Sequence, residues 1–80
     1  MLARSGLAFR LSDASVGDRL EIVSLSDMRF ARASTLLGLV EGITLEIRRC
    51  NGAGSMLVDI EGDVLRVPRP LCQTLECRAI

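Results

Sequence analysis

The sequence predicts a mainly β domain with short helices: a small five-stranded antiparallel barrel with one docked helix. Short runs of alternating apolar and polar residues recur along the chain, and turns that contain glycine separate them. Only one stretch has the apolar spacing of a substantial helix. The chain has 80 residues, of which 49% are hydrophobic, so it can form one domain with one small core. With two Phe and neither Tyr nor Trp, that core must be aliphatic.

The first predicted strand covers residues 19–25, where Leu20 and Ile22 share one face. Val23 follows Ile22 directly and interrupts the alternation, which indicates a bulge or a strand that is buried on both faces. We expect residues 1–10 to form a loose N-terminal extension and residues 11–80 to form the domain.

The predicted helix covers residues 28–37, with Ser26 or Asp27 as its N-cap. Phe30, Ala33 and Leu37 fall on one face at helical spacing, with Leu36 beside them, and we expect this face to dock on the sheet. Arg29 and Arg32 fall on the exposed side of the same helix. A helix of about ten residues is marginal in water, so docking must stabilise it.

The stretch Leu36-Leu37-Gly38-Leu39-Val40-Glu41-Gly42 ends this helix and reverses the chain. Gly38 is suited to the left-handed conformation of a helix C-terminus, and Leu39 can fold back onto the last turn. Gly42 then permits a tight turn. Gly38 and Gly42 are therefore interpreted as structural residues.

The rest of the chain predicts a strand, a hairpin and a returning strand. Residues 43–48, 56–60, 64–67 and 75–80 alternate as strands do, and turns at 51–55 and 61–63 join the first three of them. Pro70 is placed at the first position of a short helical turn through Thr74. Neighbouring strands joined this tightly are antiparallel.

Composition argues against several functions. Ten acidic residues balance ten basic ones, all Arg, so the chain lacks the basic character of a nucleic-acid binder. Without Tyr or Trp it cannot build an aromatic groove for proline-rich peptides or a stacking platform for single strands. It has no His and no glycine-rich phosphate loop, and Glu61 and Asp63 are interpreted as solvating a hairpin turn. We therefore expect no enzymatic activity.

The three cysteines do not form a disulfide framework, because their number is odd. This pattern suits a reducing compartment. Cys72 and Cys77 have the wrong spacing for a zinc knuckle and are interpreted as small buried apolar residues. No segment approaches the ~18–20 apolar residues of a membrane span. We expect a soluble, cytoplasmic protein.

Taken in order, these motifs resemble the ferrous iron transport protein A (FeoA) family. The resemblance runs from about Leu11 to Ile80, and its most specific part is Leu37-Gly38-Leu39-x-x-Gly42, the turn that the family repeats. The family commonly has a proline after a glycine at the start of the third strand, and this chain has Gly54-Ser55-Met56 there. Arg69-Pro70 also replaces the charged residues that usually precede the last turn.

The resemblance implies an SH3-like barrel and an accessory role in ferrous iron uptake. Such proteins are thought to act on the cytoplasmic GTP-binding domain of a large iron permease. On this interpretation Arg29, Arg32 and Leu39, at the exposed end of the helix, form the docking surface for the permease, and no cofactor, membrane insertion or nucleic acid is involved. Self-association as a homo-oligomer stays open.

The alternative is a transition-metal-binding or metal-sensing domain, because the same module occurs at the C-terminus of iron-dependent repressors. Only Cys, Asp and Glu are present as ligands, and carboxylates such as Glu61 and Asp63 would hold a divalent ion, iron for example, weakly through oxygen.

Overall fold

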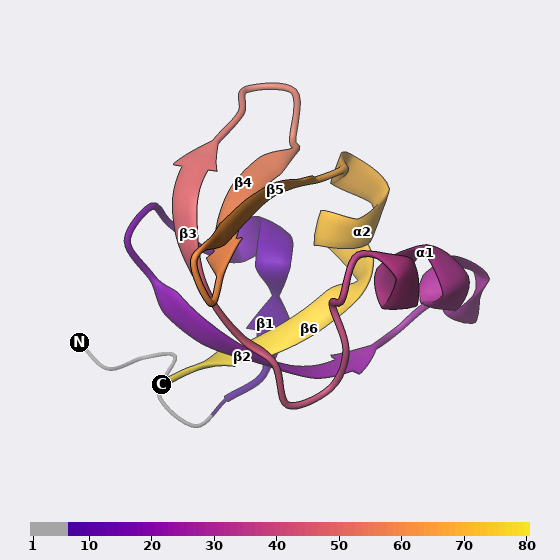
Figure 1. Cartoon of the computed structure of the whole chain (residues 1–80). Coiled ribbons are helices and arrows are strands. Elements are labelled where there is room, and N and C mark those ends of the chain that lie inside the picture. The colour runs from indigo at the N-terminus through magenta and orange to yellow at the C-terminus, as the bar shows by residue number, and fades with distance from the viewer. Residues whose placement is uncertain (1–6) are drawn as a thin grey trace.

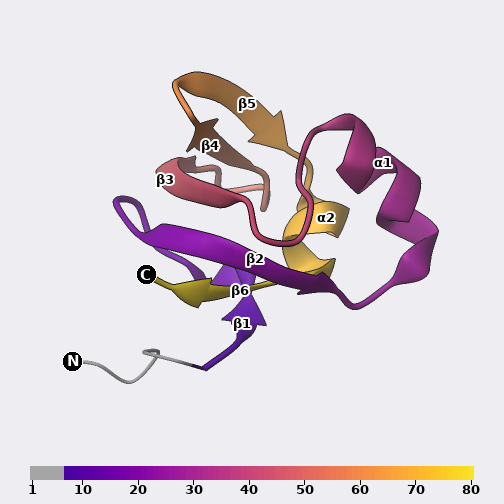
Figure 2. The same ribbon diagram turned by 60° about the horizontal axis from the view of Figure 1, so that its bottom comes forward.

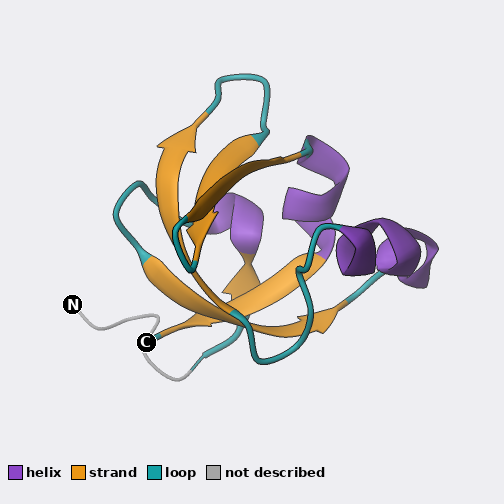
Figure 3. Ribbon diagram, viewed as in Figure 1, coloured by secondary structure: helices purple, strands orange, loops and turns teal. Residues whose placement is uncertain are grey.

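The computed structural model describes residues 7–80 and contains one sheet of six antiparallel strands with short helical segments at its ends (Figures 1 and 3). The strand order is β1-β6-β2-β3-β4-β5. The strands are β1 (Phe9–Arg10), β2 (Arg19–Leu25), β3 (Thr44–Cys50), β4 (Met56–Ile60), β5 (Asp63–Val67) and β6 (Leu75–Ala79). The helical segments are η1 (Leu11–Asp13), η2 (Met28–Phe30), α1 (Ala31–Leu36) and α2 (Arg69–Thr74). The mainly β, SH3-like architecture predicted from the sequence is confirmed, although the sheet has six strands where five were expected.

The sheet begins earlier than expected. Phe9 lies opposite Cys77 and Arg10 opposite Glu76, so these residues form the short additional strand β1 at the edge of β6. The N-terminal extension expected over residues 1–10 therefore does not reach Phe9. Residues 1–6 of that extension lie outside the described residues.

The curved sheet wraps around one aliphatic core. Val23 is the extra residue of a bulge, because Ile22 pairs with Cys77 and Ser24 with Glu76. Bulges strengthen the local twist of a strand. β2 pairs with β3 over its first three residues and with β6 from Leu20 to Leu25. The buried apolar residues are Leu11, Ala14, Leu20, Ile22, Leu39, Leu45, Ile47, Met56, Val58, Val67, Leu71, Cys72, Leu75 and Cys77.

A two-residue turn joins β4 to β5. Glu61 and Gly62 both have positive φ angles, 53° and 93°, as a type I′ turn requires. The N–H of Gly62 donates a hydrogen bond of 2.8 Å to the Asp59 side chain, and this bond stabilises the turn. Glu61 and Asp63 are exposed and belong to this turn and the start of β5.

The helix predicted over residues 28–37 is shorter and begins differently. A 3₁₀ turn, η2, precedes the six residues of α1. A 3₁₀-helix has three residues per turn, whereas an α-helix has 3.6. The side chains that follow η2 therefore point in different directions from those of a continuous α-helix. Phe30 and Leu37 are partly buried and pack against the core, as expected. Ala33, also expected on that face, is exposed, Leu36 is 80% exposed, and Ser34 is the buried residue of α1.

Candidate functional site

An apolar groove lies beside α1. It has a volume of about 290 Å³ and lies between α1, the end of β2 and the segment that leads from Leu39 to Glu41. Figure 2 shows α1 at the end of β2, with the chain then returning towards β3. Met28, 75% exposed, and Val40, 41% exposed, form its apolar walls. We refer to it as the α1 groove.

The chain reversal after α1 determines the shape of this groove. The N–H of Leu39 donates to the carbonyl of Ser34 at 2.9 Å, and the N–H of Gly38 donates to that of Thr35 at 3.0 Å. Together these bonds form a Schellman motif, and Gly38 has the φ of +78° that such a motif requires. The left-handed backbone expected at Gly38 is present, and Gly42 also has a positive φ, +90°.

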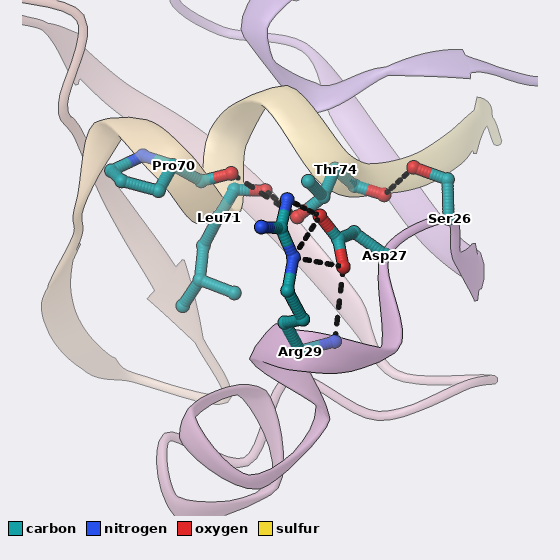
Figure 4. A network of polar contacts seen from close by, with 6 residues as sticks. All are labelled: Ser26, Asp27, Arg29, Pro70, Leu71 and Thr74. Atoms are coloured by element: carbon teal, nitrogen blue, oxygen red, sulfur yellow. Dashed lines mark hydrogen bonds and ion pairs between the residues drawn. The ribbon is translucent and has the colours of Figure 1, made fainter.

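The other end of the helical segment is fixed by Asp27. Its carboxylate accepts the backbone N–H of Arg29 at 3.0 Å, which confirms Asp27 as the N-cap, and it also pairs with the Arg29 guanidinium at 2.6 Å (Figure 4). The hydrogen bond from the Arg29 side chain is the main cause of a lowered pKa for Asp27. Nearby, the Ser26 hydroxyl donates to the carbonyl of Thr74 at 2.9 Å, which ties this corner to α2.

The structure separates the three residues expected to form a docking surface. Arg29 is exposed and its guanidinium lies over the Phe30 ring, 5.9 Å from the centroid. Arg32 is exposed and has no ion pair with another described residue. Leu39, however, is only 2% exposed, because the Schellman turn folds it into the core. Its place in the docking surface was predicted wrongly.

Sequence reasoning missed Met28 and Val40 as surface residues. Apolar residues in a helix and beside a family turn are normally assigned to a core, so their type carried no signal of exposure. Their positions along the chain provided a weak signal of exposure. Met28 directly follows the N-cap, and Val40 follows a leucine that the helix cap already buries.

The two buried thiols are unsuited to ligate metal. Cys72 and Cys77 are fully buried, as predicted, and burial raises their pKa values to about 11 and about 12. Both therefore stay protonated near neutral pH, whereas metals bind thiolates. Cys50 is exposed. Within residues 7–80, no group of three or more His, Cys, Asp or Glu side chains is arranged to hold a metal ion.

Within the same residues, no helix is long and apolar enough to cross a membrane. The α1 groove is fixed at both ends, by the Asp27 cap and by the turn at Gly38, and it opens to solvent.

Comparison with known proteins identifies the domain type. The family model described as FeoA domain matches residues 9–79. No curated protein matches the chain at a significant level.

Several solved structures share the fold. An iron uptake regulatory protein (FeoA) is 18% identical with a TM-score of 0.81, over 92% of this chain and 99% of its own. A FeoA protein from Chlorobium tepidum is 27% identical with a TM-score of 0.76, over 90% of this chain and 70% of its own. A manganese-dependent transcriptional repressor in complex with manganese is 21% identical with a TM-score of 0.84, but the 91% of this chain that aligns spans only 37% of the repressor.

Proposed function

Because the chain belongs to the FeoA domain family, we propose that it is a small cytoplasmic accessory protein of ferrous iron transport. It binds the cytoplasmic GTP-binding domain of a ferrous iron permease and modulates uptake. The family consists of small accessory domains and is not a known class of enzymes. One protein of similar structure is an iron uptake regulatory protein, and this likeness supports the proposal.

The observation that carries the proposal is the α1 groove with its exposed apolar walls. Met28 and Val40 remain exposed although the domain has a complete core. Burying a methionine side chain against a partner is worth roughly 1.5–3 kcal/mol, so these residues can contribute directly to binding. Arg32, on the same helical segment, is exposed and forms no ion pair with another described residue, so its charge would steer an acidic partner surface towards the groove.

The groove is also preorganised for binding. The Asp27 cap fixes the start of the helical segment, and the Schellman turn at Gly38 fixes its end. A surface held in one conformation loses little entropy on association. This allows a short helix to serve as a docking element.

A binding measurement with the purified GTP-binding domain of the permease tests the proposal. We expect Met28→Asp, and separately the Arg29→Glu and Arg32→Glu double variant, to weaken binding by about tenfold or more, as loss of ~1.4 kcal/mol would. Val16→Asp is the matched control, because Val16 is 61% exposed on a loop outside the α1 groove.

Failure of the unmodified protein to bind would reject the permease as its partner. Undiminished binding by Met28→Asp and by the double arginine variant would instead reject the α1 groove as the docking surface. The metal-binding alternative is not supported by any ligand cluster in residues 7–80. Anaerobic calorimetry with ferrous or manganous ion checks it.

A further inference from the structure

One edge of the sheet is open. β5 is the last strand in the order, with β4 on one side and no strand on the other within the described part of the chain. Figure 2 shows it at the outer margin of the sheet. Asp63, Val64 and Arg66 are exposed, and Val64 is 56% exposed although it is apolar. An exposed edge of this kind is a template for pairing with another chain.

The hairpin register determines which backbone groups face the open side. In a two-residue type I′ hairpin the residues that flank the turn, Ile60 and Asp63, form a hydrogen-bonded pair. Such pairs alternate along the ladder, so Leu65 and Val67 also bond to β4. The N–H and C=O groups of Val64 and Arg66 therefore point away from β4, towards the open edge.

The outer face beside this edge is basic. Arg49 pairs with Leu57, and Leu57 pairs with Arg66, so two arginines and a leucine form a row across β3, β4 and β5. Both arginines are exposed, and neither forms an ion pair with another described residue. The nearest outward carboxylate on β4, Asp59, is already paired with Arg48 at 2.7 Å.

We propose that the free edge of β5 binds an extended, acidic segment of a partner protein, which adds as an antiparallel strand. Its backbone bonds to the N–H and C=O groups of Val64 and Arg66. On the outer face, a Glu or Asp of the segment lies opposite Arg66, and an apolar residue lies opposite Val64. The proposal is independent of the α1 groove and of the permease.

Charge favours such a segment over a second copy of this chain. Antiparallel pairing of two β5 strands through the same backbone groups would be centred on Leu65. It would place Val64 of one copy opposite Arg66 of the other, so each arginine would meet a valine and no carboxylate would face it. An acidic strand that pairs in the same register places a carboxylate opposite Arg66. Because this attraction is electrostatic, the affinity of the strand for the β5 edge should fall as the salt concentration rises.

Nuclear magnetic resonance titration with a short peptide that alternates glutamate and valine tests the proposal. We expect the amide signals of Val64 and Arg66 to shift and their hydrogen exchange to slow. Arg66→Glu should weaken binding by about tenfold and favour a peptide in which lysine replaces glutamate. Val64→Pro removes an outward donor without removing a bond to β4, so it should block binding while the fold persists.

Arg10→Glu is the matched control, because it makes the same charge change on β1, at the opposite end of the strand order from β5, and it should leave peptide binding unchanged. The proposal is overturned if the glutamate and lysine peptides bind alike, if Arg66→Glu binds as tightly as the unmodified protein, or if the shifted amides lie in α1. A dimer that Val64→Pro dissociates would also overturn it, since a second copy would then occupy the edge.

Discussion

Ser34 and Leu39 hydrogen-bond to each other in both directions across the end of α1. The Leu39 N–H donates to the Ser34 carbonyl at 2.9 Å, and the Ser34 hydroxyl donates to the Leu39 carbonyl at 2.5 Å. Both residues are buried, at 3% and 2% exposure. A hydroxyl is tolerated here because its partner is a carbonyl that would otherwise be buried without a hydrogen bond.

Ser34→Ala should therefore destabilise the fold, although it removes only one oxygen atom. The Leu39 carbonyl would lose its hydroxyl partner in a buried position, and we expect a loss of about 1–3 kcal/mol in the free energy of unfolding. Urea denaturation measures it. Thr35→Ala is the control, because Thr35 is exposed on the same helix and should change stability little. Equal changes in stability for the two variants would contradict a specific role for this bond, because helix propensity alone favours alanine at both positions.

Gly38→Ala tests the backbone of the same turn. Gly38 has a φ of +78° and an added Cβ would contact nothing within 4 Å, so the cost is conformational and not steric. We expect about 1–2 kcal/mol of destabilisation. Gly52→Ala is the matched control: Gly52 also has free space around it, but its φ is not in the left-handed region. If both variants unfold at the same urea concentration, the left-handed turn is not a source of strain.

The strands and turns were predictable because local patterns determine them. Alternation placed Leu20, Ile22 and Val58 inside. The consecutive Ile22 and Val23 indicated a bulge or a strand buried on both faces, and the structure has the bulge. The glycine at position 38 predicted the helix end, because few other residues adopt a positive φ.

Features that depend on tertiary context were not predictable. Nothing local shows that residues 28–30 form a 3₁₀ turn, which rotates Ala33 outward and brings Ser34 to the core. The same context buries Leu39 and exposes Met28, so Met28 takes the place of Leu39 in the docking surface that we propose. The pairing of Phe9 with Cys77 joins residues from opposite ends of the chain and leaves no periodic signal in so short a strand.

The cysteines should differ sharply in reactivity with a thiol reagent. Cys50 is exposed, whereas Cys72 and Cys77 are buried and their raised pKa values keep them protonated. We expect one thiol per molecule to react rapidly with Ellman's reagent at pH 8 under native conditions, and all three to react in urea. Cys50→Ala should abolish the fast phase. A fast phase of more than one thiol would contradict the burial of the other two.

Alkaline pH should destabilise the fold through the buried thiols. Burial raises the pKa of Cys72 from its ordinary value of 9.0 to about 11, and that of Cys77 to about 12. Above pH 9 the unfolded chain releases protons that the folded chain retains, so stability is full below pH 9 and falls as pH rises towards 11. The slope approaches at most ~1.4 kcal/mol per pH unit for each thiol.

The buried thiols can be studied well in this chain, because it has no Lys or Tyr, whose side chains ordinarily titrate in the same pH range. Urea denaturation between pH 8 and pH 11 measures the decline. Cys77→Ala should reduce the slope, since one of the two buried thiols is gone, even if it lowers stability at every pH. Cys50→Ala, at the exposed position, should leave the slope unchanged. If the decline of the unfolding free energy with pH is as steep in Cys77→Ala as in the unmodified protein, a group other than the Cys77 thiol causes the loss of stability at alkaline pH.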